Sequence, residues 1–318
     1  MDRMVAGGFA ARCPVPRSGR RSKFDVYLFI RHCMFSLPTA GLLPTSARSL
    51  MPMRLWQPAS VPAALDCLAQ CEDPVLLAGG TDLVAQYNEG LMPRSLVDIS
   101  RLGSLRQVHQ QDGVLHIGAL VTHHAGSSDA LVRARIPGFA HAWSRIANPR
   151  IRFRATLGGN LMARRTRYEG ALLLQALEAQ LHFATASGAQ RVGVEAVWRG
   201  DSPELSVLTA IAVDTNQLLA FDYERSLRPL MTQALAVWRH PQGLRLTLTM
   251  ATENLAPVDL ALTVPGAAPG QLATRAAAIA REVLAGLPAS FADAQVTSDY
   301  ARRAGAALLA RQLESLHV

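Results

Sequence analysis

A chain of 318 residues, 49% of them hydrophobic, is long enough to bury a core and to form two domains. Its net charge of +8 is concentrated at the start, because residues 1–50 hold seven Arg, one Lys and two Asp. The remainder carries only +2, which argues against a nucleic-acid-binding surface on the folded part. Lys23 is the only lysine, so residues 24–318 offer neither a Schiff-base lysine nor the lysine of a P-loop.

Abundant Ala and Arg with a single Lys are typical of a GC-rich bacterial gene. The four cysteines form no CxxC pair, and Cys67 and Cys71 alone are too few for a zinc or iron–sulfur site. We therefore expect reduced thiols in a cytoplasmic protein, and no metal site.

Residues 1–50 mix Arg, Pro, Gly and Ser around an apolar stretch at 27–30 that is too short to span a membrane. Arg20-Arg21 ahead of this stretch leaves a twin-arginine export signal open as an alternative. The favoured interpretation is a poorly ordered extension upstream of the true start, since Met51 and Met53 precede a segment typical of a domain start. We expect residues 1–50 to add nothing to the fold, and we expect no transmembrane segment.

Apolar periodicity and turn residues predict a series of helices and strands after this extension. Pro137-Gly138 predicts a break between two helices, and Arg225 lies near the start of a second region with a hairpin and two amphipathic helices. The expected elements are, in order, helices at 61–70 (capped by Ser60) and after Asp82, strands at 75–78, 95–99 and 114–119, two helices within 123–147, a helix at 172–177, strands at 181–184, 190–194, 234–239 and 244–251, and helices at 273–284 and 296–316, the last capped by Thr297 or Ser298.

Two glycine-rich loops carry the chemistry. In the first, Gly79-Gly80 lies between a predicted strand and a predicted helix, where backbone N–H groups can bind an anion. Asp82 is better suited to capping that helix than to contacting an anion. A second loop contains Gly158-Gly159, and two joined phosphates would take donors from both loops. No two glycines are separated by a single residue, which excludes a GxGxxG dinucleotide motif.

Four segments in this order resemble the FAD-binding medium subunit of molybdenum hydroxylases, a family that includes carbon monoxide dehydrogenase and xanthine dehydrogenase types. The resemblance runs from about Arg54 to Leu316 and is weaker in the C-terminal part, where residues 296–303 are similar to the family's final helix. The segments are LAGGTDL at 77–83, LVDI at 96–99, IGALVT at 117–122 and IRFRATLGGNL at 151–161.

The resemblance implies an α+β fold. A two-lobed FAD-binding domain of the PCMH type, shared with vanillyl-alcohol-oxidase-like flavoproteins, would cover residues 51–224, and a small α+β domain would cover 225–318. The implied cofactor is FAD. The implied partners are an iron–sulfur small subunit, a molybdopterin large subunit and an external acceptor (NAD, a quinone or oxygen). The chain would relay electrons and would need no catalytic acid–base pair of its own.

The same resemblance implies the cofactor-binding residues. Glu169 would bond a ribose or ribityl hydroxyl, although a helix N-terminal carboxylate is an equally good interpretation. Ile146 lies near the flavin by position, but a core role is favoured. The implied residues are Ala78, Gly79, Gly80, Thr81, Asp82, Leu83, Thr156, Leu157, Gly158, Gly159, Asn160 and Glu169.

Residues 161–168 depart from the family, with three arginines and Tyr168 where small residues, a Pro and an Asp are usual. Either Arg164, Arg165 or Arg167 contacts an acidic partner or anionic acceptor while Tyr168 covers the flavin, or the arginines form a solvated basic face, which we favour. The isoalloxazine contacts stay unassigned.

Two other functions remain open. One is a cofactor-free scaffold or assembly protein of the same fold. The other is a stand-alone flavin reductase, for which the sequence offers no nicotinamide motif. The adjacent His123 and His124 would face opposite ways on a strand, and we interpret them as surface or supporting groups rather than metal ligands.

Overall fold

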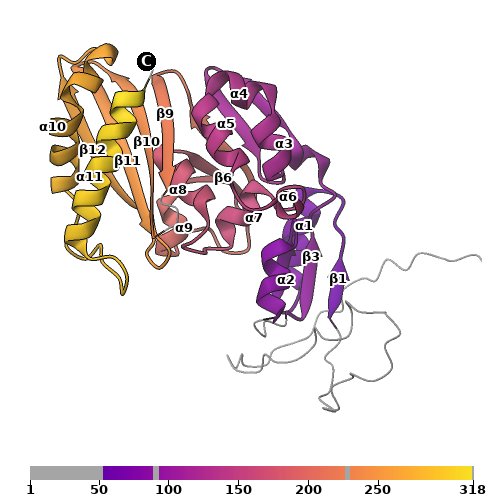
Figure 1. Ribbon diagram of the computed structural model, residues 1–318. Coiled ribbons are helices and arrows are strands. Elements are labelled where there is room, and N and C mark those ends of the chain that lie inside the picture. The colour runs from indigo at the N-terminus through magenta and orange to yellow at the C-terminus, as the bar shows by residue number, and fades with distance from the viewer. Residues whose placement is uncertain (1–52, 89–92, 226–229, 317–318) are drawn as a thin grey trace, which may run out of the picture.

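The computed structural model describes residues 53–88, 93–225 and 230–316, so the prediction for residues 1–50 lies outside the described residues. Three sheets follow one another along this part of the chain (Figure 1). The first has three parallel strands, and the second and third have five and four antiparallel strands. No helix within the described residues is long and apolar enough to cross a membrane.

The first lobe is built on the parallel sheet, in the order β1-β3-β2. Ser60 caps α1 as predicted, since its side chain accepts the N–H of Ala63, and α1 buries Ala64 and Leu68 against the sheet. Its elements are β1 (Arg54–Trp56), α1 (Val61–Gln70), β2 (Pro74–Leu77), α2 (Thr81–Asn88) and β3 (Ser95–Asp98).

The second lobe packs helices against a sheet in the order β4-β5-β8-β6-β7. The prediction of two helices within 123–147 is wrong, because three form there. Asp129 accepts the N–H groups of Leu131 and Val132 and so begins a separate helix, and Pro137 begins the third. The elements are a 3₁₀ turn (Gly103–Arg106), β4 (Val108–Gln111), β5 (Val114–Gly118), α3 (His123–Ser128), α4 (Ala130–Arg135), α5 (Pro137–Ser144), α6 (Pro149–Arg152), α7 (Leu157–Met162), α8 (Glu169–Ala176), β6 (Gln180–Thr185), β7 (Gly188–Gly193), α9 (Glu195–Arg199) and β8 (Val207–Asp214).

The third sheet has the order β12-β11-β10-β9. Its first strand, β9, pairs with β10, so the sheet begins at Leu218. The second region was expected to start near Arg225, which is instead the last residue of this edge strand. Thr297 caps the last helix, as predicted. The elements are β9 (Leu218–Arg225), β10 (Met231–His240), β11 (Gly243–Thr252), β12 (Val258–Pro265), a 3₁₀ turn (Pro269–Gln271), α10 (Leu272–Ala285) and α11 (Ser298–Ser315).

The third sheet is covered on both faces. Leu235 and Val237 of β10 pack with α10 and α11, whereas Ala234 and Ala236 point the other way and pack with α8 and the second lobe. Figure 1 shows α10 and α11 on one side of the sheet and α8 on the other. The predicted hairpin is confirmed as β10 and β11. Both faces of the hairpin are buried, because α8 covers the face that would otherwise be exposed to solvent.

Candidate functional site

The first glycine loop connects β2 to α2. Gly80 has φ +76°, a left-handed conformation that favours glycine. A Cβ on Gly79 would overlap the backbone carbonyl of Arg154 and lie 3.0 Å from the Cα of Ala155. The first loop therefore packs directly against the chain that enters the second loop, and only glycine allows this approach.

The second loop is held by hydrogen bonds inside the protein. Thr156 caps α7 by accepting the N–H of Gly159 at 3.1 Å. The N–H groups of Leu157 and Gly158 donate to carbonyl oxygens of residues 121 and 119, each at 2.9 Å. The sequence suggested that amides of both loops would bind phosphate, but these amides already have protein acceptors.

The first loop offers the stronger anion site. Thr81, Asp82 and Leu83 form the first turn of α2, where the helix itself provides no acceptor for the N–H groups. An anion at this end would face both these amides and the N-terminus of the helix dipole.

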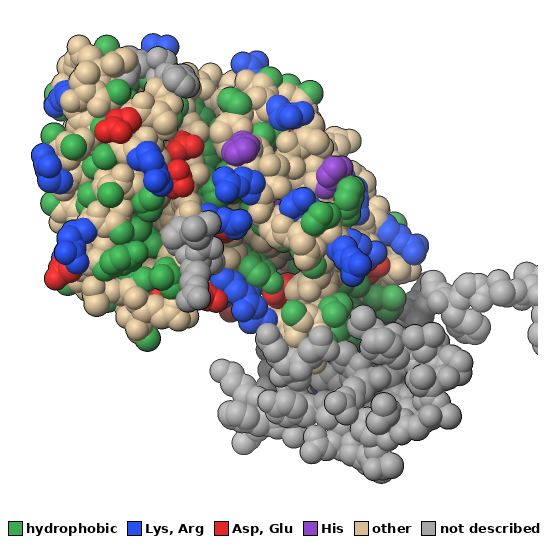
Figure 2. Space-filling model, in the orientation of Figure 1, with side chains coloured by type: hydrophobic (Ala, Val, Ile, Leu, Met, Phe, Trp, Pro, Cys, Tyr) green, Lys and Arg blue, Asp and Glu red, His purple; other side chains and the backbone are tan. Residues whose placement is uncertain are grey.

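Both loops open on one cavity of about 720 Å³, a volume within the range of cofactor pockets. Its walls come from both lobes and from the third sheet. In Figure 2, basic and acidic side chains gather along the hollowed strip between the third sheet and the N-terminal lobes. Of the predicted cofactor-binding residues, Leu157 alone does not line the cavity, because its side chain is buried in the core. The predicted residues in the lining are Ala78, Gly79, Gly80, Thr81, Asp82, Leu83, Thr156, Gly158, Gly159, Asn160 and Glu169.

Asn160 contributes a buried acceptor. Its Oδ1 atom lies against Gly170 and has no hydrogen-bond partner within the described part of the chain. Buried amide oxygens are normally paired, so an unpaired one beside a cavity indicates a missing donor. The hydroxyl groups of a ribose or ribityl chain are donors of this kind, and the site in this respect fits FAD.

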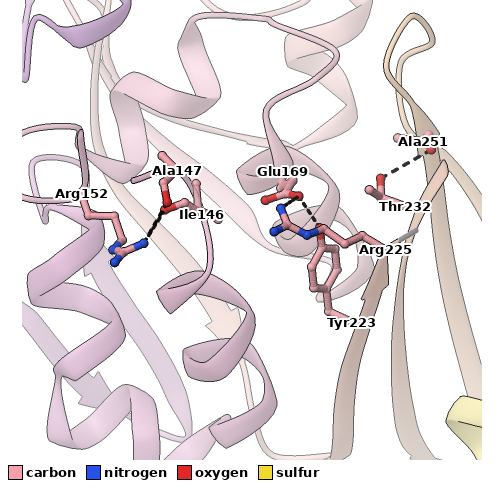
Figure 3. A network of polar contacts seen from close by, with 8 residues as sticks. All are labelled: Ile146, Ala147, Arg152, Glu169, Tyr223, Arg225, Thr232 and Ala251. Atoms are coloured by element: carbon pink, nitrogen blue, oxygen red, sulfur yellow. Dashed lines mark hydrogen bonds and ion pairs between the residues drawn. The ribbon is translucent and has the colours of Figure 1, made fainter. Parts of the chain in front are cut away.

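Glu169 lies in the first turn of α8, as one interpretation expected, and its carboxylate contacts β9 (Figure 3). Oε1 accepts hydrogen bonds from the hydroxyl of Tyr223 and from Nη1 of Arg225, the latter at 3.1 Å. Burial and then Glu169 raise the pKa of Tyr223, and Glu169 raises the pKa of Arg225. Across the cavity, Arg152 donates to the carbonyl oxygen of Ala147 at 2.8 Å.

Sequence reasoning missed the cavity residues of the third sheet. No local pattern could have found them, because they reach the site through strand pairing with residues far away in the chain. They are Arg225, Thr232, Ala251 and Thr252, together with Glu253, which directly follows β11. Ile146 belongs to the core, as favoured, and it also lines the cavity.

One arginine of the Arg-rich run, Arg165, forms an ion pair with Asp82 of α2. Oδ1 of Asp82 lies 3.2 Å from Nε of Arg165 and accepts the hydroxyl of Tyr168 at 2.7 Å. Burial and then Asp82 raise the pKa of Tyr168 to about 12, so the phenol stays protonated. The expectation of a solvated face is therefore wrong for Arg165, whereas Arg164 and Arg167 are exposed.

His123 lies in a helix and not in a strand. Of its two interpretations, a surface group or a supporting group, the first is wrong. The side chain is 1% exposed, and Nδ1 accepts the indole N–H of Trp143 at 2.6 Å. Burial, with a smaller effect of Arg152, lowers the pKa of His123 to about 4. No cluster of three or more His, Cys, Asp or Glu suited to a metal ion occurs among the described residues.

Comparison with known proteins also indicates an FAD-binding protein. The family model of the FAD binding domain in molybdopterin dehydrogenase matches residues 51–213. The FAD subunit of nicotinate dehydrogenase from Eubacterium barkeri is 28% identical over 147 residues, which cover 45% of this chain and 50% of the relative. The medium chain of carbon monoxide dehydrogenase from Hydrogenophaga pseudoflava is 31% identical over 145 residues, which again cover 45% of this chain and 50% of the relative. The match thus spans about half the length of each of these relatives.

The fold is also found among solved structures. Quinoline 2-oxidoreductase from Pseudomonas putida 86 aligns with a TM-score of 0.69 at 21% identity, covering 82% of this chain and 95% of that chain. This likeness shows the mixed helix-and-sheet architecture. Since the family model covers half of the sequence and includes both glycine loops, the chain belongs to the family of FAD binding domains in molybdopterin dehydrogenases.

Proposed function

We propose that the chain is the FAD-binding subunit of a multi-subunit oxidoreductase of the molybdenum hydroxylase type. In this role it relays electrons from the iron–sulfur clusters of a small subunit, which a molybdopterin large subunit reduces, to an external acceptor such as NAD, a quinone or oxygen. The observation that carries the proposal is the meeting of the two glycine loops at one cavity. Bound FAD would supply the redox chemistry, while the chain binds and orients it.

The residue roles follow from the contacts. The first loop, Ala78 to Leu83, would bind the pyrophosphate through its amides and the N-terminus of α2. The second loop, Thr156 to Asn160, would form the facing wall, with Asn160 Oδ1 accepting a hydroxyl. Glu169 would accept a second hydroxyl through the carboxylate that Tyr223 and Arg225 orient, since a carboxylate has about four acceptor positions.

We also propose a revised domain division. The third sheet supports a boundary in the turn at 215–217, between β8 and β9, in place of the boundary at 225 expected from the sequence. The cavity draws residues from both sides of this boundary, which gives the C-terminal domain a part in holding the cofactor.

A visible absorption spectrum of the purified full-length chain tests the proposal. We expect flavin bands, or their appearance with a shifted maximum on titration with FAD. No binding, even with added FAD, would leave the cofactor-free scaffold as the function. Co-expression with candidate small and large subunits then separates an electron-relay subunit, which should co-purify with them, from a stand-alone flavin reductase.

A further inference from the structure

Asp82 poses an electrostatic problem. It lies in the first turn of α2, among the amides that the proposed function assigns to the pyrophosphate. A carboxylate at this position would repel a phosphate, and its side chain is only 13% exposed, so solvent screens it weakly.

Gln86, Arg165 and Tyr168 surround this carboxylate, and together with Asp82 they form what we call the Asp82 cluster. Gln86, one turn along α2, donates to Oδ2. Arg165 and Tyr168 both reach Oδ1, and they come from residues 163–168, the loop between α7 and α8.

This loop connects the parts of the site. It follows α7, the helix that the second glycine loop begins, and through Arg165 and Tyr168 it reaches α2, the helix that the first glycine loop begins. Between those two residues, Thr166 donates its hydroxyl to the carbonyl oxygen of Glu253 at 2.5 Å, next to β11. One short loop thus joins the first lobe, the second lobe and the third sheet beside the cavity.

We infer that Arg165 and Tyr168 are positioning residues for the cofactor, acting through Asp82. Both hold the first glycine loop in place, and Arg165 also offsets the negative charge of Asp82 beside the pyrophosphate. This inference rests on the proposed function. It gives Arg165 a role inside the chain, in place of the contact with a partner or acceptor that was the alternative to a solvated face.

The two residues should differ in a measurable way. Tyr168→Phe removes one hydrogen bond and leaves the Arg165–Asp82 pair intact. Arg165→Gln keeps a donor of similar length but exposes the phosphate site to an uncompensated carboxylate. We expect Arg165→Gln to weaken FAD binding about tenfold, the effect of losing one charge-assisted hydrogen bond, and Tyr168→Phe to weaken it less.

Charge compensation makes a distinct prediction for a double variant. If Arg165 serves to neutralise Asp82, then Asp82→Asn combined with Arg165→Gln should bind FAD more tightly than Arg165→Gln alone. A purely structural contact predicts the opposite, since the double variant has lost more of the cluster. Arg165→Lys should bind nearly as well as the wild type, and Arg164→Gln, an exposed arginine of the same loop, is the matched control.

The experiment is an FAD titration of the full chain, followed by flavin fluorescence, for the wild type and these variants. Hydrogen exchange of α2 without FAD supplies a second reading, because loss of either contact should speed exchange at Thr81–Asn88. If the wild type binds FAD while Arg165→Gln leaves both affinity and exchange unchanged, the inference is wrong. A double variant no better than Arg165→Gln overturns charge compensation. If the wild type does not bind FAD, both the proposed function and the cofactor role of the cluster are refuted. In that case, faster hydrogen exchange of α2 in Arg165→Gln would show that the cluster only holds α2 in place.

Discussion

The indole N–H of Trp143 donates across 2.6 Å to Nδ1 of His123, a residue that lines the cavity. Because indole is a donor only, Nδ1 carries no proton, and the neutral ring has its proton on Nε2. Nε2 is buried without a partner among the described residues, and the pKa of His123 is lowered to about 4. The ring is therefore neutral at pH 7, and protonating it would break its one hydrogen bond.

This arrangement predicts a pH-dependent stability. Above the ordinary pKa of 6.5 the ring is neutral in both states. As the pH falls below 6.5 the unfolded chain binds a proton that the folded chain excludes, so stability falls until about pH 4, by about 3 kcal/mol in all. Urea unfolding of the wild type and His123→Gln over this range measures the effect. The variant should show the shallower dependence, and equal slopes would contradict the prediction.

Gly79→Ala should separate the two glycine loops. Its Cβ would overlap the backbone of Arg154, which cannot rotate away as a side chain can. We expect a loss of about 1–3 kcal/mol in the free energy of unfolding, the usual cost of overpacking, together with weaker FAD binding. Gly103→Ala is the control, because a Cβ there would meet nothing within 4 Å. Comparable behaviour of the two variants in thermal unfolding and FAD titration would sink the idea.

Glu169→Ala should destabilise the chain through its buried partner. Tyr223 is 6% exposed, and its hydroxyl would lose the carboxylate that accepts it, at a cost of about 1–3 kcal/mol. The double variant with Tyr223→Phe should cost less than the sum of the two single changes. Glu72→Ala, which removes an exposed ion pair with Arg94, should cost less than about 1 kcal/mol and serves as the control. Additive effects in chemical denaturation would argue against the contact.

A buried amide pair joins α11 to the third sheet. Gln233 donates to Oε1 of Gln312 at 2.6 Å, and both are at most 1% exposed. Gln312→Leu leaves the amide of Gln233 buried without its acceptor, so we expect a loss of about 1–3 kcal/mol in unfolding free energy. Gln233→Leu combined with Gln312→Leu removes both polar groups and should be more stable than Gln312→Leu alone. A double variant that is less stable than the single one would contradict this expectation.

Local features of the fold could be predicted from the sequence because short-range chemistry decides them. Ser60 and Thr297 begin helices by accepting an N–H group a few residues ahead, and Gly80 allows the turn after β2. The two glycine loops could be found for the same reason. The local pattern could not predict that Gly79 packs on Arg154. Nor could it predict that the amides of the second loop donate to acceptors within the protein.

Contacts between segments that are distant in the chain could not be predicted from the sequence. Asp82 was expected to cap a helix, but its main partners come from a loop far along the chain. Glu169 could be placed at a helix start, but not opposite Tyr223 and Arg225, because β9 could not be assigned to the third sheet from its own residues. His123 was misjudged since its burial depends on Trp143, a residue of another helix.

The position of α8 has a consequence for how the protein folds. Residues 170–176 are buried all round, with the second lobe on one side and the third sheet on the other. A chain shortened at the turn before β9 would leave this leucine-rich helix facing water. The parts of the chain before and after this turn should therefore unfold in a single cooperative transition, and the N-terminal part expressed alone should aggregate.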